Sequence, residues 1–329
     1  MAGYRDIVGH KQIIEHLKRA VSMNKISHAY IFNGEKDSGK RMIAEAFAQT
    51  LQCEAGGSEP CMNCRSCRQA KEYNHPDIIY VTHEKPNLIS VDEIRHQLNN
   101  DIVIKPYSGK YKIYIVEEAE KMNEAAQNAL LKTLEEPPSF AVILLLTSNA
   151  DGFLPTILSR CVTFHLRTVG EDLIKDLLMR KYQVPDYQAE VCAAFAQGNV
   201  GKAIHLASDP DFNQKKSEII SLAKKIEDMD LYEFGRGVQM ISQYKDSMGD
   251  FFDLLTLWYR DVLYYKSTES ASNLIFKDEV YDIKKQAAKK SFSNIEAILK
   301  GIELAKSRLG SNVNFELTIE LLLFTMKEN

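Results

Sequence analysis

The sequence lacks a long apolar run, and it lacks a strong charge of either sign. No stretch approaches the roughly 18 apolar residues that a membrane-spanning helix needs, and the first ten residues hold no apolar core of a signal peptide. The 41 basic and 45 acidic residues give a formal net charge of −4, which argues against a strongly basic nucleic-acid-binding protein. We therefore expect a cytoplasmic, globular protein of two or three domains.

Cysteine is also scarce, but the six cysteines are not spread evenly. Four of them follow the spacing C-x7-C-x2-C-x2-C, and in a reducing compartment such a cluster is more often a metal site than a pair of disulfides. Four thiolates satisfy tetrahedral Zn²⁺ and leave no open position for catalysis. The sequence thus predicts a structural zinc site made of Cys53, Cys61, Cys64 and Cys67. His75 and His83 are interpreted as surface histidines outside the site.

Short apolar runs alternate with helical patterns through the first half of the chain. Each run is aliphatic or β-branched and is bounded by polar residues, which is typical of strands in a buried parallel sheet. The predicted strands are Ala29–Phe32, Asp77–Val81, Ile113–Val116, Ala141–Leu146 and Val162–Phe164. A helix between the third and fourth strands should stop before Pro137, because the residue before a proline avoids helical geometry. The pattern predicts a doubly wound α/β domain.

The first predicted strand runs into GEKDSGKR, which has the form of a P-loop. Gly34 and Gly39 would let backbone N–H groups turn toward phosphate, and Lys40 would reach the β- and γ-phosphates. The eighth position normally carries Ser or Thr, whose hydroxyl binds Mg²⁺. Here it is Arg41, and a guanidinium cannot ligate a cation.

The third predicted strand runs into Glu117 and Glu118, which have the form of a Walker B acidic pair. Such a pair holds Mg²⁺ in P-loop ATPases, although Glu117 stands where Asp is usual. Together with Arg41, this change predicts a site that binds ATP and Mg²⁺ weakly or not at all, or that has lost hydrolysis. The alternative is a relic loop that is retained for its shape.

Two strings further along carry a family resemblance. They are NALLKTLEEPP and, further along, ILSRC. Because both strings occur in this order, the chain resembles the clamp-loader branch of the AAA+ ATPases. The resemblance implies that Arg160 reaches the nucleotide of a neighbouring subunit, with Ser159 and Cys161 positioning it. An arginine supplied in trans stabilises transition-state charge. On the residues alone, an arginine in a buried structural ion pair is the alternative.

The same resemblance assigns further roles. Ser148 matches the sensor that touches the γ-phosphate or its attacking water, although a polar turn at a strand end is equally consistent with the sequence. Residues 1–28 would lie beside the adenine pocket, and bacterial clamp-loader motor and stator subunits carry a zinc module where the cysteines lie. Gly201 stands where active ATPases carry a second arginine sensor, and this departure favours a stator over a motor subunit.

The resemblance extends over the whole chain and predicts three domains. These are an AAA+ P-loop domain with a zinc module at residues 1–167, a helical lid at residues 168–208 and an all-α collar domain at residues 209–329. Only helical patterns remain beyond residue 209. Ser293 and Asn314 are expected to cap two of the collar helices.

The implied function is that of a stator subunit. It would assemble with gamma/tau and delta subunits, load a sliding clamp on primed DNA and donate Arg160 to an adjacent ATP site. A catalytically active gamma/tau-type ATPase is the first alternative. A stand-alone zinc-dependent DNA-binding module is the second, but the net charge of −4 disfavours it.

Overall fold

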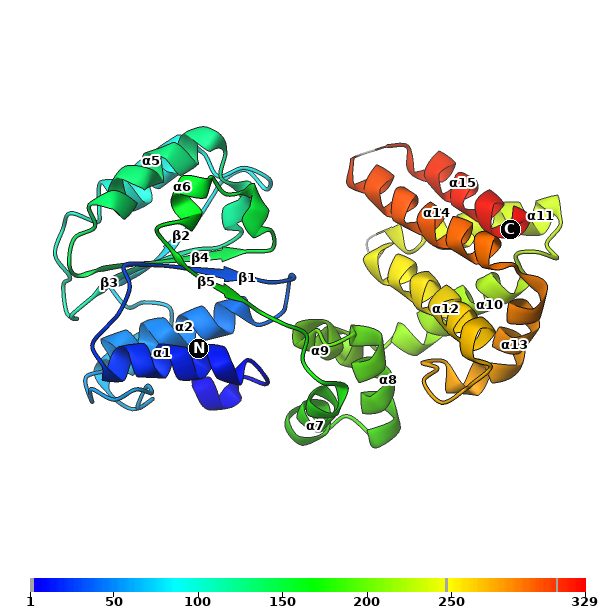
Figure 1. Cartoon of the computed structure of the whole chain (residues 1–329), viewed down its shortest axis with the longest axis horizontal. Coiled ribbons are helices and arrows are strands. Elements are labelled where there is room, and N and C mark those ends of the chain that lie inside the picture. Colours follow the sequence, from blue (N-terminus) through cyan, green and yellow to red (C-terminus); the bar gives the residue numbers. More distant parts are fainter. Residues whose placement is uncertain (1–2, 246–247, 312) are drawn as a thin grey trace. The chain divides into compact units, whose positions relative to one another are not determined.

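The computed structural model describes residues 3–245, 248–311 and 313–329. The chain divides into two compact units, Met1–His205 and Leu206–Asn329, and Figure 1 labels most of their helices and strands. The finer division of the first unit at residue 168 stays a prediction. Across the described ranges, no helix combines the length and the apolar character that a membrane span requires.

A five-stranded parallel sheet forms the centre of the first unit, in the order β2-β3-β4-β1-β5. Its strands are β1 Ala29–Asn33, β2 Ile78–Val81, β3 Lys112–Val116, β4 Ala141–Thr147 and β5 Val162–His165. All five predicted strands are present, and the α/β class is confirmed. One expectation was wrong. Strand β5 is half-buried to exposed rather than buried, because it lies at an edge of the sheet and pairs only with β1.

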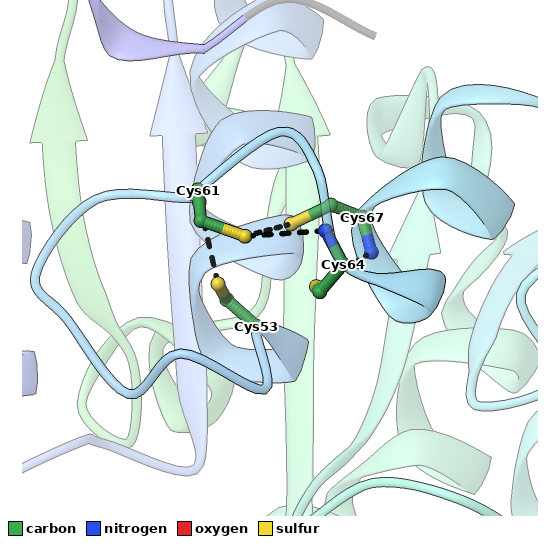
Figure 2. A group of neighbouring side chains, drawn as sticks. All are labelled: Cys53, Cys61, Cys64 and Cys67. Atoms are coloured by element: carbon green, nitrogen blue, oxygen red, sulfur yellow. Dashed lines mark hydrogen bonds between the residues drawn. The ribbon is translucent and has the colours of Figure 1, made fainter.

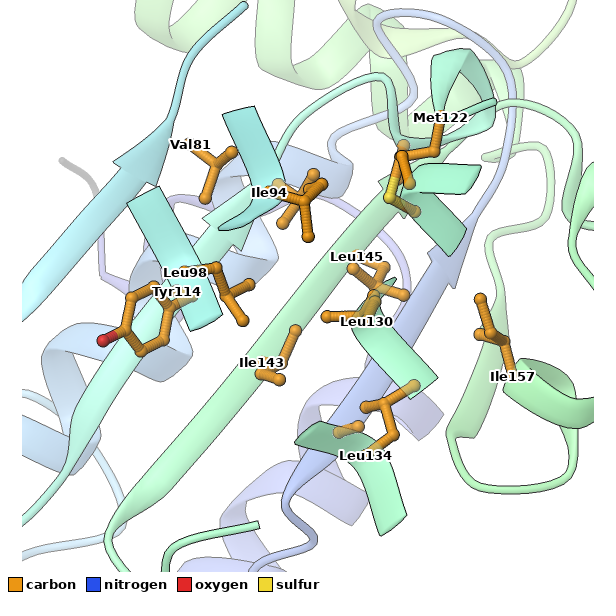
Figure 3. Close-up of a cluster of buried hydrophobic side chains, with 14 of the residues drawn as sticks. Val81, Ile94, Leu98, Tyr114, Met122, Leu130, Leu134, Ile143, Leu145 and Ile157 are labelled. Carbon is orange, nitrogen blue, oxygen red and sulfur yellow. The ribbon is translucent and has the colours of Figure 1, made fainter. Parts of the chain in front are cut away.

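Helices cover both faces of this sheet (Figure 1). Side chains alternate along each strand, so Tyr114 faces one apolar cluster and Ile115 faces the other. The first cluster is packed under α5 and α6 (Figure 3) and the second under α1 and α2. The helical elements of this unit are η1 Tyr4–Asp6, α1 Lys11–Ser22, α2 Lys40–Gln52, α3 Arg65–Lys71, α4 Val91–Ile94, η2 Arg95–Asn99, η3 Ala119–Lys121, α5 Glu124–Glu135, η4 Ala150–Gly152, α6 Pro155–Leu158, α7 Glu171–Tyr182, α8 Asp186–Ala196 and the first part of α9 Val200–Ser208.

The ends of these helices follow local sequence signals. Ser90 and Glu93 form the expected capping box at the start of α4, since each side chain binds a backbone N–H that the first turn leaves free. The helix that follows changes from α to π geometry at Arg95, which the sequence pattern did not indicate. Helix α5 ends at Glu135, before Pro137, as predicted.

The second unit is helical throughout its described residues. Helix α12 is buried on several sides, as its apolar residues predict, and Trp258 on it donates from Nε1 to Gln286 Oε1 at 2.8 Å. The elements are α10 Phe212–Lys225, α11 Leu231–Ser242, α12 Met248–Thr268, η6 Lys277–Glu279, α13 Val280–Lys289, α14 Phe292–Gly310 and α15 Phe315–Glu328.

One of the two predicted caps in this unit is correct. The Asn314 side chain accepts from the N–H of Leu317 at 3.0 Å and caps α15. The prediction that Ser293 caps the preceding helix was wrong. Ser291 is the cap of α14 and accepts from the N–H of Asn294 at 3.1 Å, because the helix already begins at Phe292 and Ser293 lies inside its first turn.

Candidate functional site

The four predicted zinc ligands come together at the end of α2 and the start of α3 (Figure 2). Cys53 is the C-terminal cap of α2, Cys64 is the N-terminal cap of α3, and all four Sγ atoms lie within 4.8 Å of one another. The backbone N–H groups of Cys61, Cys64 and Cys67 each donate to the Sγ of the preceding cysteine of the cluster at 3.3 Å. The turn therefore gathers the sulfurs and directs hydrogen-bond donors at them.

These residues fit a structural tetrahedral metal site. Backbone N–H groups of Asn63 and Cys64 lower the pKa of the Cys61 thiol to about 6, which favours the thiolate form that a metal binds. Burial instead raises the pKa of Cys67, so a metal would have to displace that proton on binding. Four sulfur donors match Zn²⁺ and leave no position for a catalytic water.

His75 is not a surface residue, so that interpretation was wrong. It is 4% exposed. Its Nδ1 accepts from the N–H of Asp77 at 3.1 Å, and its Nε2 lies 3.0 Å from the Oγ of Ser66 on α3. Burial lowers the pKa of His75, which keeps the ring neutral. The histidine ties the cysteine-bearing helix to the sheet instead of binding metal. His83 is partly buried, with Nε2 3.4 Å from the Glu118 carboxylate.

The P-loop connects β1 to α2, as predicted. Gly39 has φ of +96°, so the turn into the helix requires glycine at this position. Lys40 does not extend away from the loop. Its Nζ donates to the carbonyl oxygens of Gly34 and Glu35 at 2.5 and 2.6 Å, and burial lowers its pKa. The lysine that would bind phosphate is thus already bound to its own loop.

Arg41 makes contacts on both sides of the expected metal position. Its Nε lies 2.8 Å from Glu45 and its Nη1 lies 3.2 Å from Glu117. The rings of Tyr73 and Tyr80 lie 5.5 and 5.7 Å from the guanidinium carbon. Burial raises the pKa of Glu117 even though Arg41 is its neighbour. The two altered motif positions are therefore joined directly by an ion pair.

The remaining acidic and polar candidates divide into separate groups. Glu118 has a left-handed backbone (φ 50°) and pairs with Lys121 at 2.6 Å rather than with the P-loop. Ser148 donates to Glu120, a residue that the sequence reasoning did not select. The only hint of Glu120 was that a third acidic residue follows the expected pair.

The start of α9 lies directly on the P-loop. The N–H of Gly201 donates to the Asp37 carbonyl at 3.1 Å, and a Cβ at position 201 would lie 2.6 Å from that oxygen. Asn199, which sequence reasoning missed, donates to the Lys36 carbonyl at 2.8 Å. Position 201 therefore has no room for a side chain larger than hydrogen. It is the position at which we expect an arginine in active ATPases of the family.

A cavity of about 270 Å³ lies between the chain's first segment and the strand that follows Arg160. Its lining includes Gly9, His10, Arg167 and Val169, in the region where the family resemblance places an adenine pocket. The volume falls just below the range of about 300 to 1,000 Å³ that is usual for small-molecule sites.

The Ser-Arg-Cys tripeptide connects α6 to β5. Arg160 donates from Nη1 to the Thr156 carbonyl at 2.9 Å, and its Nη2 lies 2.9 Å from the Glu135 carboxylate. The Ser159 hydroxyl binds the same carbonyl at 3.0 Å. Cys161 packs against the core, and burial raises the pKa of its thiol to about 12. The Thr156 carbonyl and the Glu135 carboxylate thus hold Arg160, while its guanidinium remains partly exposed.

Residues 9–170 match the family described as DNA polymerase III, delta subunit, and residues 229–328 match the family described as its C-terminal region. The DNA polymerase III subunit delta' of Bacillus subtilis (strain 168) is 30% identical over 323 residues, which is 96% of each chain.

Other relatives share part of their length with this chain. The DNA polymerase III subunit tau of Bacillus subtilis is 28% identical over 84% of this chain and 53% of its own. A gamma subunit-related protein from Thermotoga maritima, a solved structure, has 21% identity, coverage of 96% and 98%, and a TM-score of 0.47. On the full-length match to a delta' subunit and the two family matches, the chain belongs to the delta-prime family of DNA polymerase III subunits.

Proposed function

We propose that this chain is the stator subunit of a bacterial DNA polymerase III clamp loader, with no strong ATPase activity of its own. The observation that carries the proposal is the P-loop, in which Lys40 and Arg41 are both bound to groups of the chain itself. A motor subunit needs these positions free for phosphate and Mg²⁺. The gamma/tau-type alternative is disfavoured for the same reason.

The partners follow from the family. The proposed assembly contains gamma/tau and delta subunits and acts on a sliding clamp and primed DNA in the cytoplasm, where the polymerase works. Residues 1–167, 168–208 and 209–329 would be the P-loop domain, the lid and the collar through which the subunits associate. Zn²⁺ at the four cysteines would be a structural cofactor, and ATP with Mg²⁺ would bind to neighbouring subunits.

Arg160 is the proposed catalytic contribution of the chain. Its guanidinium is partly exposed, at 35%, and its pairing partner Glu135 is 51% exposed. Exchange of that carboxylate for a phosphate of a neighbouring subunit therefore requires little desolvation. In trans, such an arginine contributes roughly 10³- to 10⁵-fold to the rate of phosphoryl transfer.

The test is DNA-stimulated ATP hydrolysis by the reconstituted complex, with the unaltered chain or with Arg160→Ala. We expect hydrolysis to fall by orders of magnitude while sedimentation shows the assembly intact. Arg180→Ala is a matched control, because Arg180 is 82% exposed and also pairs with a single carboxylate. Unchanged hydrolysis in Arg160→Ala would reduce the role of the chain to that of a scaffold.

A further inference from the structure

Arg41 contacts more of the chain than the loss of ATPase activity requires, although its side chain is 51% exposed. Two carboxylates and two tyrosine rings meet its guanidinium, and they come from four separate segments: Glu45 from α2, Glu117 after β3, Tyr73 after α3 and Tyr80 from β2. We call these four side chains the cation cage. The phenol groups of Tyr73 and Tyr80 in turn lie 3.5 and 3.4 Å from the Glu45 carboxylate.

The cage needs a cation because of Glu45. That residue is 3% exposed, and a buried carboxylate is costly unless an opposite charge and hydrogen bonds compensate it. The Arg41 Nε at 2.8 Å supplies both the charge and a donor. The other end of the guanidinium reaches Glu117 at 3.2 Å, so a single cation joins α2 to the end of β3.

The chemistry of the cage selects an organic cation. In a P-loop ATPase, Mg²⁺ would lie between the eighth P-loop residue and the Walker B carboxylate. Here the eighth residue is Arg41, and its own positive charge pairs with the Glu117 carboxylate. Aromatic faces attract a guanidinium, which is weakly hydrated and planar, whereas Mg²⁺ dehydrates reluctantly and prefers six oxygen ligands.

We propose that the metal position of this P-loop has become a guanidinium-binding site, which Arg41 fills in cis. Its function is to hold the P-loop helix against β2 and β3 without Mg²⁺ or nucleotide. The inference rests on the contact between Arg41 and Glu117 that also supports the proposed function, but it concerns the isolated chain and would hold if the chain had no stator role. It predicts that the cage, once emptied, binds free guanidinium.

The experiment is chemical rescue of Arg41→Ala in the full chain, followed by thermal unfolding. We expect the variant to have a lower Tm than the unaltered chain, and we expect millimolar guanidinium chloride to raise that Tm in a saturable way. Concentrations of this order are far below those that denature proteins. Sodium chloride at equal ionic strength and urea at equal concentration should have no such effect, and neither should guanidinium on the unaltered chain or on Arg180→Ala.

Three results would overturn the proposal. The first is an Arg41→Ala variant as stable as the unaltered chain. The second is a folded, less stable variant that guanidinium does not rescue, which would mean that the site does not bind guanidinium as a ligand. The third is Mg²⁺-dependent ATP binding by the unaltered chain in calorimetry, because the metal and Arg41 would compete for Glu117.

A second variant keeps the proposal testable if Arg41→Ala does not fold. Glu117→Gln removes one charge of the cage from a side chain that is 37% exposed and leaves the pair between Arg41 and the buried Glu45 in place. We expect its Tm to be lower than that of the unaltered chain. An unchanged Tm would mean that the guanidinium does not hold the helix to the strand.

Discussion

The guanidinium of Arg160 lies 2.9 Å from the carboxylate of Glu135, and solvent reaches both side chains. The two sequence strings on which the family resemblance rests, one ending in Glu-Glu-Pro-Pro and one in Ser-Arg-Cys, are thus in contact in the fold. An exposed ion pair of this kind is worth about 0 to 1 kcal/mol. Such a weak pair orients Arg160 but does not prevent it from leaving Glu135. An arginine that acts on a neighbouring subunit requires this property.

Glu135→Ala should therefore have a small effect. We expect a change in the free energy of unfolding of less than about 1 kcal/mol, and clamp-loader ATP hydrolysis that is equal to or faster than that with the unaltered chain. Urea denaturation of the chain and hydrolysis by the reconstituted complex measure the two quantities. A loss of hydrolysis as large as that of Arg160→Ala would mean that the pair, and not the arginine, is the functional element.

Cys64→Ser should remove the metal. Elemental analysis of the purified chain is expected to find one zinc per chain before the change and none after it, because three sulfurs hold Zn²⁺ much less tightly than four. The loop before Cys61 should then become sensitive to proteolysis. Cys192→Ala is the control, since Cys192 lies in α8 outside the cluster. Full zinc content in Cys64→Ser would refute the site.

Asp77 should make the first unit sensitive to acid. Its carboxylate accepts from the N–H groups of Tyr107, Ser108 and Gly109 at 2.5, 2.8 and 2.9 Å. Burial acts to raise the pKa of Asp77, but these donors outweigh it, so the folded pKa lies below the unfolded one. The stabilisation is therefore present above the unfolded pKa of about 4 and is lost as pH falls through the folded pKa.

Asp77→Asn tests this dependence. At neutral pH we expect the free energy of unfolding to fall by about 1 to 3 kcal/mol, because an amide cannot replace a charged carboxylate that accepts hydrogen bonds from several N–H groups. The difference in the free energy of unfolding between the variant and the unaltered chain should become smaller as pH falls below about 4. Urea denaturation over a series of pH values measures it. A difference that stays constant with pH would show that the charge of Asp77 is not the cause.

Gly201→Ala tests the contact between α9 and the P-loop. The added Cβ would lie 2.6 Å from the Asp37 carbonyl oxygen. We expect the free energy of unfolding to fall by about 1 to 3 kcal/mol, and we expect faster hydrogen exchange of the P-loop amides. Gly235→Ala is the matched control. It also lies in a helix but has open space around it, so it should stabilise the chain by up to about 1 kcal/mol. Equal effects of the two changes would contradict the contact.

Local chemistry could be predicted from the sequence, and long-range placement could not. The four-cysteine cluster was predictable because Cys61, Cys64 and Cys67 lie within seven consecutive residues, where spacing fixes geometry. The cation cage was not, because Tyr73 and Tyr80 reach Arg41 from segments far along the sequence. The P-loop was recognised, but its state depends on contacts that only the fold creates.

The acidic residues after β3 illustrate the same limit at shorter range. The sequence favoured Glu117 and Glu118 as a pair, yet Glu117 contacts Arg41 whereas Glu118, which has a left-handed backbone, pairs with Lys121. Glu120 meets Ser148 instead. Two of the three carboxylates meet partners that are distant in the sequence, Arg41 for Glu117 and Ser148 for Glu120, so the residue pattern does not show which contact each one makes. In the same way, the sequence contains five strands but not their order, so the edge position of β5 was missed.

The strand order has a consequence for the synthesis of the protein. Strand β1 lies between β4 and β5, and its first paired residues, Ala29 and Ile143, are 114 positions apart in the chain. At the roughly 5 to 20 residues per second of translation, β1 and its attached P-loop exist for about 6 to 23 seconds before either neighbour is made. The apolar strand AYIF must be kept from other chains during that interval, so the nascent protein is most vulnerable to aggregation before residue 147 emerges from the ribosome.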